Sequence, residues 1–388
     1  MRALCRTGSG DALAMARQSQ LTVAFVLLDG EVTGGQVVAH QLMQGLRERG
    51  HAALAVFPRE GPMADRVRAD GFPVLVLPLD RTYRLDQALA LARALRRSGA
   101  TVVHAHTLFV GTMLVRAASL LARLPLVEHV HIEERFSTRP AAALVQRLLA
   151  RATSGIPRAT IVVSGQVELA ALGLGARPGR VSVIHNGVRV GPAEPPPHGQ
   201  GSLRLACVAR LAPVKGQEVL IDALALAGPG IEADLAGDDL EQGGAYRRAL
   251  ELRAADRGVA GQLRFLGRCD DVPSLLRSAD ALVLPSYDEG LPLVALEAFA
   301  QARTVVASAV GGLPELVADG QNGLLCPPGS ADPGRGPAPA PRRARAAHAA
   351  RGSGACPRRR GLRRGGDAGA DAGGVPQRRP LTGAVTMA

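Results

Sequence analysis

Leu21-Thr-Val-Ala-Phe-Val-Leu-Leu28 is a short apolar run that is followed by Asp29-Gly30 and then by Gly34-Gly35. A helical pattern from Val38 to Arg49 comes next, and after it a second apolar run, Ala53–Phe57. Runs without polar alternation indicate strands that are buried on both faces, as parallel strands are. The order strand, glycine loop, helix, strand therefore predicts the opening of a parallel α/β sheet.

The same pattern continues along the chain and restarts after a linker. Further strands are expected at Val74–Leu77, Thr101–His104, Leu126–Val130, Thr160–Val163 and Val181–Ile184, and then at Leu203–Ala209, Ile231–Ala236, Leu263–Leu266, Ala281–Leu284 and Thr304–Ala307. Residues 189–201, between the two series, are rich in Pro and Gly, which is typical of a linker. The sequence thus predicts an α/β protein with two Rossmann-like, doubly wound domains, at 19–188 and 202–330, that face an interdomain cleft.

The net charge of +12 is unevenly distributed. Residues 19–188 carry 19 basic and 12 acidic side chains, a balance of +7, whereas residues 189–330 carry 12 and 18, a balance of −6. Residues 331–388 add 12 basic and three acidic side chains, or +9. The opposite signs of the two central blocks indicate two domains with different partners.

Targeting and redox signals are weak. The five cysteines have neither metal-ligand spacing nor the pattern of a disulfide framework, which favours a reducing compartment. The chain has no apolar run of ~18 residues, so we expect no spanning helix. Residues 1–18 lack the apolar run of a signal peptide and are predicted to be a disordered leader. These features predict a cytoplasmic protein.

Glu289 and Glu297 follow the strand expected at Ala281–Leu284. Glu289 lies in the loop after the strand, beside Gly290, and Glu297 lies in the helix expected at Leu293–Gln301. The N-terminus of a helix suits a diphosphate, and a carboxylate can accept hydrogen bonds from a ribose diol. The alternative is one acid favoured by the helix dipole and one solvated acid.

Arg210 and Lys215 lie in the loop after the first strand of the second series. Lys215 is the only lysine of the chain. A guanidinium and an ammonium five residues apart can bracket a diphosphate from two sides. Taken alone, Arg210 and Lys215 could equally be two solvated cations on the surface.

The chain resembles the retaining family-four glycosyltransferases of the GT-B fold, because several motifs occur in the family's order from about Leu21 to Pro328. Besides the residues above, these motifs are the Gly34-Gly35 loop, Val183-Ile-His-Asn-Gly-Val188, Gly267-Arg-Cys-Asp-Asp-Val-Pro273, Val310-Gly-Gly-Leu-Pro-Glu-Leu-Val317 and Asn322-Gly-Leu-Leu325. The resemblance implies that the C-terminal domain holds a UDP- or GDP-sugar. It also implies that the N-terminal domain holds a glycan, lipid or small-molecule acceptor, as in polysaccharide biosynthesis.

The resemblance also implies roles for individual residues. Arg210 and Lys215 would contact the diphosphate in place of a metal, so that no metal or other cofactor is needed. Glu289 would sit by the donor sugar and Glu297 would bind the ribose. Backbone close to the sugar and phosphates would come from Gly35, Gly290, Leu291, Pro292 and Leu293. The sugar would be transferred with retention at the anomeric carbon, and no protein nucleophile is named.

Four histidines lie at strand ends of the first domain. His131 falls where the family has a histidine at the acceptor side, and is a catalytic candidate on that ground. His129 would share its strand face, and His104 and His106 end another strand. A hydrogen-bonded structural role is the alternative for each.

The basic N-terminal domain has two interpretations. Arg139, Arg147 and Arg151 flank the apolar helix expected at Ala141–Ala150. They form either a solvated helix face or a patch for peripheral contact with the inner face of an anionic membrane. Nucleic-acid binding is not expected, because the arginine runs lack interleaved aromatics and no recognition module is present.

The hydrophobic pattern ends after Pro328, where the resemblance implies further helices that brace the N-terminal domain. Residues 331–388 hold four Leu or Val, no Ile and no aromatic residue. We predict a disordered tail and interpret it as the product of a frameshift near Ser330. Weak stability and low or no activity would follow. A non-catalytic remnant that binds nucleotide sugars is therefore the second functional hypothesis, and a sugar-nucleotide epimerase is the third.

Overall fold

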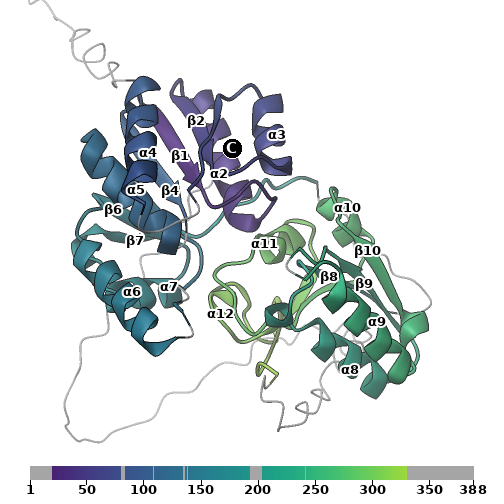
Figure 1. Cartoon of the computed structure of the whole chain (residues 1–388). Helices are drawn as coiled ribbons and strands as arrows, with labels where there is room; N and C mark the ends of the chain where they lie inside the picture. Colours follow the sequence, from purple (N-terminus) through teal and green to yellow (C-terminus); the bar gives the residue numbers. More distant parts are fainter. Residues whose placement is uncertain are drawn as a thin grey trace, which may run out of the picture. The chain divides into compact units, whose positions relative to one another are not determined.

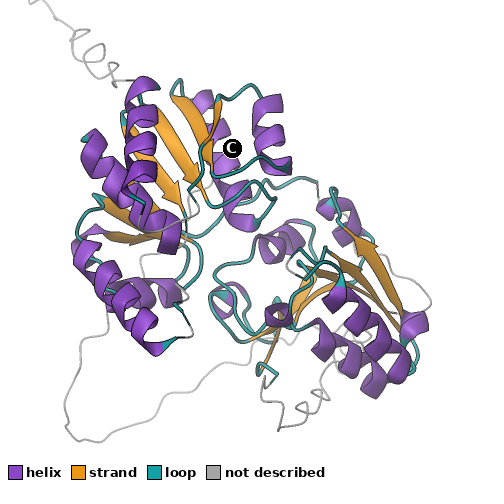
Figure 2. Ribbon diagram, in the orientation of Figure 1, coloured by secondary structure: helices purple, strands orange, loops and turns teal. Residues whose placement is uncertain are grey.

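The computed structural model describes residues 20–79, 84–107, 109–133, 136–137, 139–192, 203–240 and 242–329, with backbone alone at 109–111. These residues form two parallel β-sheets with helices packed on them (Figures 1 and 2). The predicted leader, the frameshift near Ser330, the tail and most of the linker lie outside the described residues. No described helix is long and apolar enough to cross a membrane.

The first sheet has seven strands in the order β3-β2-β1-β4-β5-β6-β7. They are β1 (Thr22–Leu27), β2 (Ala52–Phe57), β3 (Val74–Val76), β4 (Val102–His106), β5 (Leu126–Val130), β6 (Ala159–Val162) and β7 (Val181–Val183). Alternate residues of β1 are buried on opposite faces. Ala24 and Val26 join one apolar core, and Phe25 joins the other. Burial on both faces explains why this strand is a continuous apolar run.

The second sheet has six strands in the order β10-β9-β8-β11-β12-β13. They are β8 (Leu203–Val208), β9 (Ile231–Ala236), β10 (Leu263–Gly267), β11 (Ala281–Leu284), β12 (Thr304–Ser308) and β13 (Gly323–Cys326). Leu282 and Leu284 pack in one core and Val283 packs in the other, as in β1. Both sheets are doubly wound, and their topological switch points lie between β1 and β4 and between β8 and β11.

The described α-helices lie between successive strands. They are α2 (Gly34–Glu48), α3 (Pro62–Ala69), α4 (Leu85–Arg97), α5 (Phe109–Ala122), α6 (Pro140–Thr153), α7 (Gly165–Gly173), α8 (Gln217–Ala227), α9 (Ala245–Asp256), α10 (Val272–Arg277), α11 (Leu293–Ala300) and α12 (Leu313–Leu316). Short 3₁₀ turns occur at Pro178–Arg180, Pro213–Lys215 and Ala260–Gln262.

The predicted fold class is confirmed, and the differences are local. Each expected strand is present with its ends shifted by at most two residues. The first helix begins at Gly34 rather than Val38, so the glycine pair forms its first turn instead of a loop before it. The strand Gly323–Cys326 was not expected, since its segment was read only as a motif.

Candidate active site

Lys215 and Glu289 flank the switch point of the second sheet. Lys215 follows β8 and Glu289 follows β11, and these strands are hydrogen-bonded neighbours. The carboxyl ends of parallel strands meet at one edge, which brings together side chains that are 74 positions apart. Lys215 Nζ lies 2.7 Å from Glu289 Oε1, and Ser286 Oγ donates to the same oxygen at 2.8 Å. The ammonium therefore balances a carboxylate that is only 9% exposed.

Two glycines let backbone segments approach each other beside this pair. A Cβ at Gly311 would lie 1.6 Å from the carbonyl oxygen of Glu289, and Gly311 has a positive φ of 57°. A Cβ at Gly290 would lie 1.6 Å from the carbonyl oxygen of His131. The N–H of Gly312 donates to the carbonyl of Gly290 at 2.7 Å. The loop that carries Glu289 is thus held between backbone segments that a larger residue would push apart.

Arg210 and Glu297 lie farther out on the same elements. Arg210 is exposed at the end of β8, and its carbonyl accepts a hydrogen bond of 2.9 Å from Gln217 Nε2. Glu297 is half-buried on α11, where burial raises the pKa of its carboxyl. Within the part of the chain that the structure describes, the Glu297 carboxylate makes no hydrogen bond or ion pair with another residue.

His131 directly follows β5 and lies against Gly35, the second residue of α2. A Cβ at Gly35 would be 3.1 Å from His131 Cδ2. Nε2 of His131 lies 2.8 Å from Nδ1 of His106, so one of these nitrogens carries the proton that is shared. Burial holds the pKa of His131 well below its ordinary value. The imidazole is therefore neutral near pH 7.

Residues after β6 and β7 contact helix α12 and the loop before α11. Glu315 accepts a hydrogen bond of 2.8 Å from the backbone N–H of Gly165, and its other oxygen lies 3.0 Å from His185 Nε2. Asn186 Nδ2 donates to the carbonyl of Leu291 at 2.8 Å. The Leu291 side chain packs in a small apolar cluster with Val162, Val163 and Val167. Leu291 thus holds the Glu289 loop, and its carbonyl is already paired.

Two family models match the chain over most of its length. The model "Glycosyltransferase Family 4" matches residues 32–191, and the model "Glycosyl transferases group 1" matches residues 194–333. The chain belongs to glycosyltransferase family 4. The first match spans the sheet that carries His131, and the second spans the sheet that carries Lys215 and Glu289.

Curated relatives match part of this family-4 chain. The D-inositol 3-phosphate glycosyltransferase of Mycolicibacterium gilvum is 36% identical over 161 residues, which are 39% of this chain and 36% of that protein. That of Mycobacterium tuberculosis H37Ra is 35% identical over 162 residues, or 39% and 34% of the two chains. The matches therefore span about a third of the length of these curated relatives.

Solved structures share the two-sheet fold. Anabaena Alr3699/HepE in complex with UDP and glucose has a TM-score of 0.68 and 25% identity, over 80% of this chain and 86% of that chain. The lipopolysaccharide outer core galactosyltransferase WaaB has a TM-score of 0.62 and 16% identity, over 80% and 87%, and this likeness shows the fold alone. The GT-B architecture of the family-4 chain is thus confirmed.

Sequence reasoning missed several residues that shape this site. No role is predicted for Ser286 from the sequence, although its hydroxyl donates a hydrogen bond to Glu289. Glu315 and Asn186 lie in the motifs Val310–Val317 and Val183–Val188, and neither was expected to contact residues of the other sheet's domain. A polar residue inside an otherwise apolar motif was the only signal.

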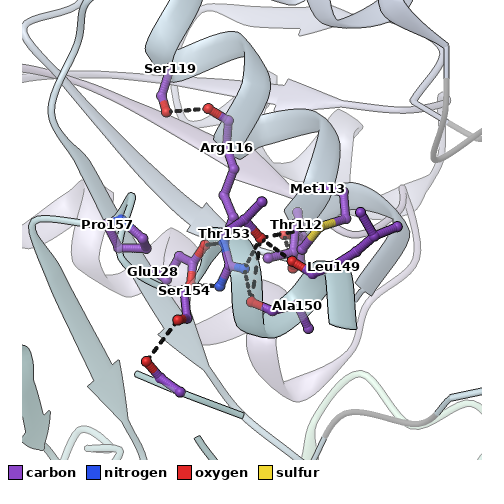
Figure 3. Close-up of polar contacts among 12 residues, drawn as sticks. Thr112, Met113, Arg116, Ser119, Glu128, Leu149, Ala150, Thr153, Ser154 and Pro157 are labelled. Carbon is purple, nitrogen blue, oxygen red and sulfur yellow. Dashed lines mark hydrogen bonds and ion pairs between the residues drawn. The ribbon is translucent and has the colours of Figure 1, made fainter. Parts of the chain in front are cut away.

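A buried ion pair lies in the first sheet of the family-4 chain (Figure 3). Arg116 on α5 donates to both carboxylate oxygens of Glu128 on β5, at 2.6 and 2.8 Å. Its remaining nitrogen donates to the carbonyl of Ala150 and to the hydroxyl of Thr153, both on α6. These contacts tie α5 and α6 to β5, the strand that precedes His131.

Proposed function

We propose that this chain transfers a sugar from a UDP- or GDP-sugar to a hydroxyl acceptor, with retention of the anomeric configuration and without a metal. The observation that carries the proposal is the Lys215–Glu289 pair at the switch point between β8 and β11. Ligands of doubly wound sheets bind at such points. Membership in family 4 and the likeness to a protein solved with UDP and glucose support the same conclusion.

The cations Lys215 and Arg210 would stabilise the leaving diphosphate. As the bond between the anomeric carbon and the diphosphate oxygen breaks, negative charge develops on that oxygen. A fixed cation near this oxygen lowers the barrier, and more so where water is excluded. The Lys215 side chain is 18% exposed and held by Glu289, so it is already oriented. Two protein cations would take the place of a divalent metal.

Carboxylates would bind the two ends of the donor. Glu289 would accept hydrogen bonds from hydroxyls of the donor sugar, with the backbone of Gly290 and of Leu291–Leu293 beside it. Glu297 would accept hydrogen bonds from the ribose diol. Its half-buried carboxylate favours this, since none of the described residues pairs with it.

Retention would follow from attack on the face that the diphosphate leaves. The acceptor oxygen would form its bond to the anomeric carbon while the diphosphate departs, and the hydroxyl proton would pass to the departing diphosphate oxygen. His131 and Gly35 would lie where this reaction takes place, since His131 contacts both Gly35 and Gly290. A neutral imidazole at that point could orient a hydroxyl through a hydrogen bond.

The test is a screen of UDP- and GDP-sugars with calorimetric binding and product analysis, run in chelator. We expect transfer of the sugar or hydrolysis of the donor. The product should keep the donor's anomeric configuration, which is read from the proton coupling constant by NMR. Binding without turnover would favour the non-catalytic remnant, and an epimerised donor would favour the isomerase. An inverted product would contradict same-face transfer, and activity that depends on added Mg²⁺ or Mn²⁺ would contradict the absence of a metal at the diphosphate.

For the acceptor side, we propose peripheral contact of α6 with an anionic membrane. Leu144, Val145 and Leu148 are 59%, 51% and 58% exposed, and Arg147 and Arg151 on the same helix are exposed as well. Exposed apolar side chains flanked by arginines are typical of helices that lie at anionic lipid surfaces. Vesicles that contain an acidic phospholipid should sediment the chain, and L144S/L148S should weaken this binding. Equal sedimentation of the double variant would contradict the contact.

A further inference from the structure

Four histidines lie on one face of two neighbouring strands in the first sheet. His104 and His106 alternate along β4, and His129 and His131 alternate along β5 and the residue after it. Ala105 pairs with Glu128 in the parallel register, which brings His106 level with His129. The ring centroids of His106 and His129 are 4.7 Å apart, and those of His104 and His129 are 5.6 Å apart.

Several nitrogens of this cluster are buried without a partner. Within the part of the chain that the structure describes, Nε2 of His104, Nε2 of His106 and both ring nitrogens of His129 have no hydrogen bond. A buried polar atom without a partner costs roughly 1–3 kcal/mol, so several together in one place call for an explanation. Phe25 stacks on His104 at 5.0 Å, so this ring has an apolar neighbour as well as the other histidines.

We propose that His104, His106 and His129 bind one divalent transition-metal ion, with Zn²⁺ the expected occupant. One ligand nitrogen from each of the three lies within 4.8 Å of the others. Three imidazoles are a common ligand set for zinc, with Zn–N distances of about 2.0–2.1 Å. Tetrahedral ligands at that distance are about 3.4 Å apart, so small ring rotations would bring the nitrogens into place. The ligands are all nitrogen, which favours Zn²⁺, Co²⁺ or Ni²⁺ over Mg²⁺ or Ca²⁺.

His131 would act as the outer partner of this ion. A histidine that binds a metal through one nitrogen usually donates its other N–H to a neighbour, which fixes the tautomer. Nδ1 of His106 lies 2.8 Å from Nε2 of His131, whereas Nε2 of His106 is unpaired. If Nδ1 of His106 donates, its Nε2 lone pair is free for the metal, and the proton of His131 is held on Nδ1.

The proposal leaves the donor diphosphate to Lys215 and Arg210, and it would hold even if no sugar transfer were found.

The test uses the full chain without an affinity tag, which is stripped with chelator, reloaded with Zn²⁺ and then dialysed to remove unbound metal. Zinc per chain is measured by elemental analysis, affinity by competition with a chromophoric chelator, and ligand type by the visible spectrum of the Co²⁺ form. His129→Phe removes two unpartnered nitrogens and keeps a ring in the stack, so the variant should fold. His51→Gln is the matched control, because His51 lies outside the cluster and accepts a hydrogen bond from the backbone of Leu21.

We expect one zinc ion per chain for the wild type and for His51→Gln. His129→Phe should bind zinc at least about 100-fold more weakly than the wild type. A 100-fold loss is the upper end of what removal of an outer partner costs, and His129 is proposed as a direct ligand. The Co²⁺ form should show d–d bands without a thiolate charge-transfer band. The proposal is overturned by a wild type that binds no zinc, by equal affinity in His129→Phe, or by a thiolate band. Should His129→Phe not fold, the stoichiometry and Co²⁺ spectrum of the wild type still decide.

Discussion

Removing Arg116 should be among the most destabilising single changes in the first sheet. The side chains of Arg116 and Glu128 are 10% and 7% exposed, and the guanidinium makes four hydrogen bonds. Arg116→Met keeps the length of the side chain but leaves a buried carboxylate without a counterion. Breaking a buried pair in this way costs about 3–5 kcal/mol. Losing both partners costs far less, so Arg116→Met/Glu128→Leu should recover most of that free energy.

The assay is urea denaturation followed by circular dichroism, with the free energy of unfolding compared across the double-mutant cycle. The matched control is Arg247→Met, which breaks the exposed pair with Glu251 on α9 and should cost only about 0.3–0.5 kcal/mol. Equal losses in Arg116→Met and Arg247→Met, or a double variant as unstable as Arg116→Met, would refute the reasoning.

Two further predictions concern the donor site. Gly290→Ala places a Cβ 1.6 Å from the His131 carbonyl oxygen and must move the Glu289 loop, so transfer should fall by about 10²-fold. Gly173→Ala should keep wild-type activity, because among the described residues its new Cβ meets no atom within 4 Å beyond its own helix and chain neighbours. Similar rates for both variants would count against the close approach. Because burial raises the pKa of Glu297, its carboxylate is lost at a higher pH than that of an exposed glutamate, and the donor KM should rise as the pH falls through that raised pKa. Glu297→Gln should flatten this profile, and an unchanged profile in the variant would remove Glu297 from the ribose site.

The fold could be predicted because its main signal is local. The run from Thr22 to Leu27 is apolar on both faces, and a strand buried on both faces is what that pattern means. The strand Gly323–Cys326 was missed because it begins with Gly and is four residues long, which is too short for periodicity to act. The first helix was begun four residues late, since a glycine pair predicts a loop, whereas packing against His131 favours helix from Gly34 onward.

The site could be predicted only as a set of residues, and its contacts could not. Lys215 stood out as the chain's one lysine, and Glu289 stood out after a strand, yet only the strand order β8-β11 brings them within 2.7 Å. The histidines gave a visible alternation along two strands. That they share one face depends on which strands pair and in which register, and a single sequence does not contain that information.

Sugar transfer by Glu289→Gln, measured beside Asp288→Asn, tests the central claim most directly. The two variants make the same change of charge at adjacent positions of one loop, and Gln can keep the hydrogen bonds to Ser286 and Lys215 that hold the loop. We predict that Glu289→Gln lowers kcat by about 10²–10³-fold, as the loss of a group that stabilises the transition state does, while nucleotide affinity stays within about twofold. Asp288→Asn should remain close to wild type. Transfer at the wild-type rate by Glu289→Gln would contradict the assignment of the Lys215–Glu289 pair as the donor-sugar site.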